Sequence, residues 1–209
     1  MEFITPIFKW IHIIAGVLWI GLLYFFNWIN GHVAATMDGD TKKKVVPELM
    51  PRALYFFRWG AAWTWVTGMV LLLLVYWMQM NDSMFRELGI GEEASKFKHA
   101  AYLIPFIMVF VYDAFYKSSL AKNTRVATIT SFMGIAGVLC LLICVSEMTS
   151  YRAYNIHLGT MFGSMMAFNV WYRIWPAQQR IITAIKNGDA PNPADAGMAG
   201  LRSKHNTYM

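Results

Sequence analysis

Long apolar blocks separated by short polar connectors make up most of this chain. A helix that crosses a bilayer needs about 20 consecutive, mostly apolar residues. Five blocks approach or reach that length, at about residues 7–29, 53–78, 99–116, 126–148 and 156–175. The pattern therefore predicts an all-α integral membrane bundle of about five transmembrane helices.

The basic residues gather in alternate connectors. The connector 30–52 holds Lys42, Lys43, Lys44 and Arg52, the connector 117–125 holds three basic residues and no acid, and the segment after Trp175 is also basic. Lysine and arginine stay on the cytoplasmic side of a membrane. We therefore expect the N-terminus outside and the C-terminus inside.

This topology predicts two parts of unequal size. Residues 1–176 form the transmembrane helical domain, and residues 177–209 form a cytoplasmic tail. Residues 176–186 can continue as a short interfacial helix. The stretch 188–197 contains Gly188, Pro191, Pro193 and Gly197, a composition typical of a loop.

The composition agrees with a membrane location. Hydrophobic residues make up 57% of the chain and charged residues 14%, against about 25% charged in an average soluble domain. The net charge of +6 lies in connectors, which indicates membrane topology rather than nucleic-acid binding. No cleavable signal sequence is expected. Cys140 and Cys144 lie on one predicted helix, poorly placed for a disulfide, and the sequence has no C-x-x-C-H motif for c-type haem.

Three histidines are expected near the outer face. His12 lies about one and a half turns into the first helix, His99 opens the third and His157 opens the fifth. Ionisable side chains inside a membrane are costly and often functional, and imidazole is the usual axial ligand of b-type haem. A metal site other than haem has no support, because no carboxylate or second histidine has suitable spacing.

The neighbours of two of these histidines suit a flat buried ligand. Gly16 lies one turn from His12, on the same face as Trp19 and Leu23, and would leave room for a macrocycle edge. His157 is followed by a ridge of small residues, Gly159 and Gly163. The hypothesis is therefore a haem held by His12 and His157, with His99 as a third candidate. The alternative is that these histidines are solvated residues at the membrane interface. This interpretation applies best to His99, which lies beside Lys96 and Lys98.

A second group of polar residues lies toward the predicted inner face. Arg58 begins the second helix and Asp113 ends the third, and an ion pair between them would cancel two costly charges. We interpret this pair as a structural clamp in preference to a transport or proton path. The tryptophans of the second helix, Trp59, Trp63 and Trp65, are interpreted as membrane-interface anchors.

Several stretches resemble the membrane domain of the bacterial urate oxidase (urate hydroxylase) family. They are the first-helix segment 10–21, the second-helix segment 57–68, the fifth-helix segments 157–170 and 174–180, and the terminal segment 202–209. His12, His157 and His205 fall on family-like positions, and His32 is a further candidate. The preferred interpretation of His32 and His205 is that they are loop histidines on the cytoplasmic side, without a functional role.

The resemblance implies a bacterial inner-membrane domain of about eight helices, followed by a periplasmic cytochrome c domain. It also implies that the protein oxidises urate and passes on electrons. This sequence of 209 residues contains neither the further helices nor the cytochrome c domain. We therefore expect a shortened relative, or a chain that another membrane subunit completes.

Three functions follow from these features. The first is a membrane redox protein with b-type haem near the outer face, a urate oxidase-like oxidoreductase or a subunit of one, with cytochrome c or another electron-transfer partner. The alternative is a structural or accessory subunit of a larger respiratory or photosynthetic complex. A small transporter is disfavoured, because broken helices and repeat symmetry are not evident, with Pro105 the one internal proline of the predicted spans.

Overall fold

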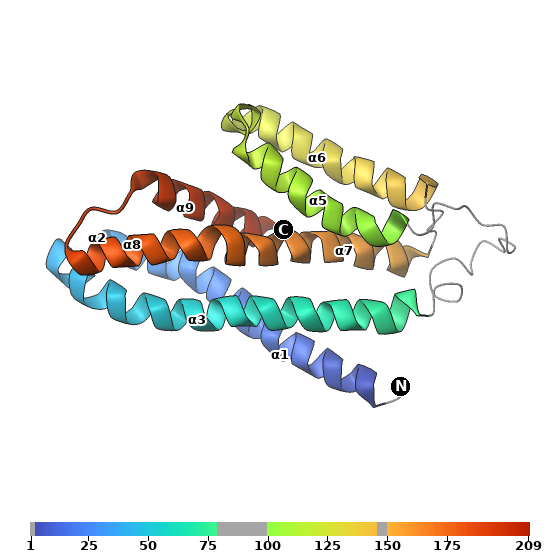
Figure 1. Ribbon diagram of the computed structural model, residues 1–209, viewed down its shortest axis with the longest axis horizontal. Helices are drawn as coiled ribbons and strands as arrows, with labels where there is room; N and C mark the ends of the chain where they lie inside the picture. Colours follow the sequence, from blue (N-terminus) through green and yellow to red (C-terminus); the bar gives the residue numbers. More distant parts are fainter. Residues whose placement is uncertain (1–2, 79–99, 146–149) are drawn as a thin grey trace, which may run out of the picture. The chain divides into compact units, whose positions relative to one another are not determined.

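The computed structural model describes residues 3–78, 100–145 and 150–209, and every regular element in these ranges is helical (Figure 1). The predicted all-α fold is confirmed for this part of the chain. Its α-helices are α1 (Ile4–Tyr24), α2 (Gly31–Thr36), α3 (Gly39–Leu72), α5 (Ala100–Lys117), α6 (Thr124–Cys140), α7 (Tyr151–Phe168), α8 (Trp175–Asn187) and α9 (Pro193–Tyr208). Wider π-type turns extend several of them, at Phe25–Asn30, Leu73–Trp77, Leu141–Val145 and Asn169–Ile174, and a short 3-10 turn at Ser119–Lys122 lies between α5 and α6.

Three continuous helices are long and apolar enough to cross a membrane. They run over Ile4–Thr36, Gly39–Trp77 and Thr124–Cys144 and coincide with the first, second and fourth predicted spans. Helices α5 and α7, of 18 residues each, occupy the places of the third and fifth. The total of five spans and their orientation stay predictions.

The connector predicted at 30–52 is helical over most of its length. The second span was predicted to begin near residue 53, whereas helix α3 is 34 residues long and begins at Gly39. Its start is capped by Asp38, whose carboxylate accepts hydrogen bonds from the Thr41 backbone N–H at 2.9 Å and hydroxyl at 2.7 Å. Such a cap satisfies an otherwise unpaired donor of the first turn. The connector was inferred from its basic residues, which mark the cytoplasmic side of a membrane but do not prevent a helix from continuing beyond the apolar block. Pro47 and Pro51 lie inside this helix.

The contacts divide the chain into two compact units. The first comprises Met1–Thr67 and Met166–Met209, and the second comprises Gly68–Met165. The predicted boundary at residue 176 separates a transmembrane domain from a cytoplasmic tail by their location relative to the membrane, not by packing contacts. It stays a prediction.

In the first unit α1 and α3 approach closely at a glycine. A Cβ atom added to Gly60 would lie 3.3 Å from the Trp19 Cβ atom, so the absence of a side chain lets the two backbones meet. Trp19 is 3% exposed. It belongs to an apolar cluster with ten other buried residues: Leu23, Met50, Leu54, Phe57, Ala61, Met166, Ala167, Val170, Ile174 and Ile182.

Helix α9 is fastened to this unit by buried amides. The Asn206 side chain donates to the Met166 carbonyl at 3.0 Å and accepts from the Asn169 Nδ2 at 2.9 Å. The Asn27 side chain of the first helical segment bonds Ser203 at 2.8 Å. The C-terminal 16-residue helix is therefore part of the core packing of the first unit.

Helices α8 and α9 form an antiparallel pair joined by a short turn (Figure 1). Gly188, at a φ of 86°, ends α8 in the left-handed region, where a residue without a Cβ is favoured. The predicted interfacial helix at 176–186 is confirmed as a helix, whereas the predicted loop 188–197 is too long. The sequence Asn192-Pro193 starts α9, since the Asn192 side chain accepts the Ala194 N–H at 2.9 Å and proline suits the first helical position.

Two side-chain features complete the α8–α9 pair. Arg180 forms a two-bond ion pair with Asp195, at 2.6 and 2.9 Å, which holds the Asp195 pKa below its usual value. His205 is half-buried on α9, and its burial together with the nearby charge of Arg202 lowers its pKa to about 4. The predicted inner histidine His205 is therefore a helical residue and not a loop residue.

In the second unit α5 and α6 lie side by side (Figure 1), with a hydrogen bond of 2.9 Å between the Tyr116 and Ser131 hydroxyls. The Asn123 side chain caps α6 by accepting the Arg125 N–H. Large apolar side chains remain exposed along both units, among them Val17, Phe132 and Met133. Exposed apolar surface on this scale is compatible with a lipid bilayer as the surroundings of these helices.

The approach at Gly60 generates a stability prediction. Replacing Gly60 by leucine should lower the free energy of unfolding in detergent by about 1–3 kcal/mol, because overpacking must push α1 from α3. Thermal unfolding followed by circular dichroism measures the change. Gly21→Leu is the matched control, because an added Cβ there meets nothing within 4 Å. Equal destabilisation by both variants would contradict a close contact specific to Gly60.

The lowered pKa of His205 generates a pH prediction. The unfolded state takes up a proton near pH 6.5 while the folded state stays neutral down to about pH 4. The folded state is therefore fully favoured above pH 6.5 and loses this part of its stability as the pH falls toward 4. His205→Gln should flatten the fall in thermal stability between about pH 7 and pH 5, whereas the exposed His32→Gln should keep it. An unchanged slope in His205→Gln would contradict the assignment.

Candidate functional site

His12 lies where α1 meets α3. Its Nδ1 is 2.9 Å from the Thr64 carbonyl oxygen and 3.2 Å from the Thr67 hydroxyl. A carbonyl can only accept, so Nδ1 carries the proton and donates it. In the tautomer with the proton on Nδ1, Nε2 carries the lone pair, and no hydrogen bond reaches Nε2 from the described residues.

His157 is the most enclosed of the described histidines, with 0% of its surface exposed. Its Nδ1 donates to the Ala153 carbonyl at 2.8 Å, one turn earlier on α7. Its Nε2 accepts the indole N–H of Trp77 at 3.0 Å. The rings of Tyr76 and Trp77 lie against it, with centroids 6.3 and 6.4 Å away. The imidazole is thus neutral, oriented and fully bonded.

Both histidines share one arrangement, in which a backbone carbonyl holds the Nδ1 proton and leaves the lone pair on Nε2. Metal-ligating histidines commonly have this second-shell partner, which fixes the tautomer and the ring orientation. The donor chemistry therefore fits axial ligation of haem iron. At His12 the lone pair is available as it stands, and at His157 iron would have to replace the Trp77 hydrogen bond.

The remaining predicted cofactor residues divide by position. Gly16 faces α3, and a Cβ added to it would lie 3.8 Å from the Thr64 methyl group, an ordinary contact. The space beside Gly16, which was predicted to leave room for a macrocycle edge, therefore adjoins Thr64. His99 lies outside the described residues. His12 and Gly16 belong to the first unit and His157 to the second, so the pairing of His12 with His157 stays a prediction.

Arg58 and Asp113 each have partners within their own unit. The Arg58 guanidinium lies over the Trp175 ring, 4.0 Å from its centroid, and near the rings of Trp171 and Tyr55. Such cation–π contacts stabilise a partly desolvated arginine. The Asp113 carboxylate is bonded to Lys117 at 2.8 Å, one turn further along α5. An ion pair between Arg58 and Asp113 stays a prediction, since they belong to different units.

Three further sequence predictions concern the cysteines, non-haem metal ligands and His32. Cys140 and Cys144 are both free thiols, as expected from their spacing on one helix. In the described parts of the chain no three histidine, cysteine, aspartate or glutamate side chains gather in a way that could hold a metal ion. His32 is exposed, with its Nδ1 bonded to the Trp28 carbonyl one turn earlier.

Sequence reasoning missed the groups that orient the histidines. Thr67 is fully buried beside His12, and Trp77 is the donor to His157. The pair Thr64 and Thr67, three residues apart on one helix face, was a usable signal for polar groups turned inward. Trp77 had no such signal, because a tryptophan near a helix end normally indicates an interface anchor.

Comparison with known proteins places the chain in a family. Residues 39–209 match the family described as urate oxidase N-terminal, a range that includes Arg58, Asp113 and His157 and leaves His12 and Gly16 before its start. No curated protein and no solved structure matches the chain. Because the match covers most of the sequence, this chain belongs to the urate oxidase N-terminal family.

Proposed function

We propose that this chain is the membrane part of a urate-oxidising electron-transfer system and holds b-type haem through His12, His157 or both. Membership of the urate oxidase N-terminal family supports the first half of the proposal. The second half rests on the enclosure of these two rings together with the backbone carbonyl that holds each Nδ1 proton, since the exposed His32 has the same carbonyl bond without the enclosure. This bond leaves Nε2 as the ligand atom on both rings.

His12 is the stronger candidate ligand. Its Nε2 needs to give up no hydrogen bond within the described residues, and Thr64 and Thr67 hold the ring from the other side. His157 is held just as firmly, but its Nε2 already accepts the Trp77 N–H. Ligation at His157 would therefore require Trp77 to turn away, at the cost of one buried hydrogen bond, about 1 kcal/mol.

When bound, haem supplies one-electron transfer. The protein's own contribution is to orient both imidazoles through their Nδ1 bonds and to surround His157 with aromatic rings. In the predicted topology both histidines lie toward the outer face. A periplasmic cytochrome c or a further membrane subunit is then the natural electron acceptor.

The proposal predicts a haem spectrum. Protein purified in mild detergent from cells with ample haem should show a Soret band that shifts on reduction. His12→Ala should lose most of it, His157→Ala should lose part or all of it, and the double variant should lose it completely. The matched control is His32→Ala, because His32 is exposed and its ring is bonded only within its own helix; this variant should keep the band.

Two results would contradict haem binding by these residues. One is a colourless wild-type protein from haem-replete cells, and the other is a double variant with the wild-type spectrum. A colourless protein that co-purifies with large subunits would support the alternative function, an accessory subunit of a membrane complex. Anaerobic addition of urate tests the substrate separately, since haem that binds but is not reduced by urate indicates another electron donor.

A further inference from the structure

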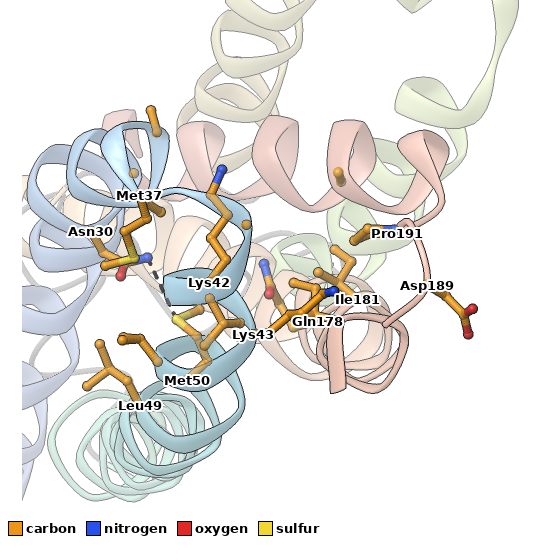
Figure 2. Close-up of a pocket in the computed structure, with 18 residues that line it drawn as sticks. Asn30, Met37, Lys42, Lys43, Leu49, Met50, Gln178, Ile181, Asp189 and Pro191 are labelled. Atoms are coloured by element: carbon orange, nitrogen blue, oxygen red, sulfur yellow. Dashed lines mark hydrogen bonds between the residues drawn. The ribbon is translucent and has the colours of Figure 1, made fainter. Parts of the chain in front are cut away.

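A cavity of about 600 Å³ lies in the first unit between the start of α3 and helix α8. Its volume falls within the range of about 300–1,000 Å³ that is typical of small-molecule sites. Figure 2 shows side chains from both regions turned toward it, with Leu49 and Met50 from α3 and Ile181 from α8. The lining segments, residues 30–50 and 178–196, lie just outside the predicted spans.

The cavity combines apolar walls with a few polar groups. Valine, leucine, isoleucine, methionine and alanine side chains form most of the lining. The Asn30 amide lies inside and donates to the Met50 sulfur at 3.7 Å, and the Gln178 amide reaches the cavity from α8. Walls of this kind favour a hydrocarbon chain, with the polar groups setting its orientation.

Two lysines supply the charge of the cavity. Lys42 is half-buried and Lys43 is exposed, and both line it. Neither ammonium forms an ion pair with the described residues. Of the nearby acids, Glu48 pairs with Arg52, Asp38 accepts from Thr41, and the Asp189 carboxylate points away from the other labelled side chains (Figure 2). Asp40 lies next to the lysines in sequence but outside the cavity lining. An ammonium without an ion-pair partner at the edge of an apolar cavity attracts an anion.

The position of the cavity identifies the kind of anion. Aromatic side chains that typify the membrane interface, such as Trp28 and Trp175, occur in the adjoining segments. Basic pockets between transmembrane helices bind anionic lipid head groups. By contrast, a second hollow of about 650 Å³ between α1 and α3 has no charged residue in its lining, and so offers no preference among head groups.

We propose that this cavity binds one anionic phospholipid, with an acyl chain against Val46, Met50 and Ile181 and the phosphate between Lys42 and Lys43. The lipid would bridge α3 and α8 within the first unit. This site is separate from the histidines, so it does not depend on haem binding or on urate as substrate.

Lipid competition tests the site. The full chain is purified in mild detergent with equal amounts of phosphatidylglycerol and phosphatidylcholine, and bound lipid is identified by native mass spectrometry. The wild type should retain phosphatidylglycerol in preference. Removing the two charges in Lys42→Gln/Lys43→Gln should weaken this preference by about fivefold per lysine.

A matched control separates a site from general surface charge. Lys44→Gln/Lys122→Gln removes the same charge from exposed lysines outside the cavity lining, and should keep the preference. Ala34→Trp narrows the cavity without changing the charge, and should reduce retention of phosphatidylglycerol while thermal stability stays near that of the wild type.

Three results would overturn the proposal. The first is equal loss of preference in both double-lysine variants, which would indicate diffuse attraction to the surface. The second is full retention in Ala34→Trp, which would place the lipid outside the cavity. The third is inorganic phosphate displacing phosphatidylglycerol at comparable concentration, which would mean that a free anion and not a lipid is recognised.

Discussion

The constraint that governs this protein is that a polar group inside an apolar helical bundle must find a partner there. Water cannot supply it, and an unpaired buried group costs about 1–3 kcal/mol. At several buried imidazoles and amides the structure meets this requirement with side chains that reach backbone carbonyls. His12 bonds Thr64, His157 bonds Ala153 and Asn206 bonds Met166. These bonds also decide which nitrogen of each histidine is left for a ligand.

The same constraint explains the C-terminal segment. A polar tail would normally remain outside the apolar packing, but α9 brings Asn206 and Ser203 to polar partners in earlier helices. Its other end is held by the Arg180–Asp195 ion pair. The last 16 residues therefore help to shape the first unit, and with α8 they border the surface next to the proposed lipid cavity.

Much of the architecture could be predicted from local pattern. The apolar blocks located the helices because a bilayer-spanning helix has a required length, and the motif at 157–170 indicated the family that the comparison confirmed. The helix starts at Gly39 and Pro193 were missed. The basic residues of the first segment indicated a connector, and glycine and proline suggested a loop in the second, whereas the caps at Asp38 and Asn192 favour a helix.

The sequence by itself determined the helical membrane class, the positions of the apolar helices and the family, because these depend on length, periodicity and motif. Tertiary structure alone decided that Thr67 lies beside His12, that Trp77 donates to His157 and that Arg58 lies over Trp175. These contacts join residues distant in the chain, and no local pattern of hydrophobic and polar positions encodes which helix faces meet. The physical reason is that packing selects the partner of a buried polar group only once the helices have come together.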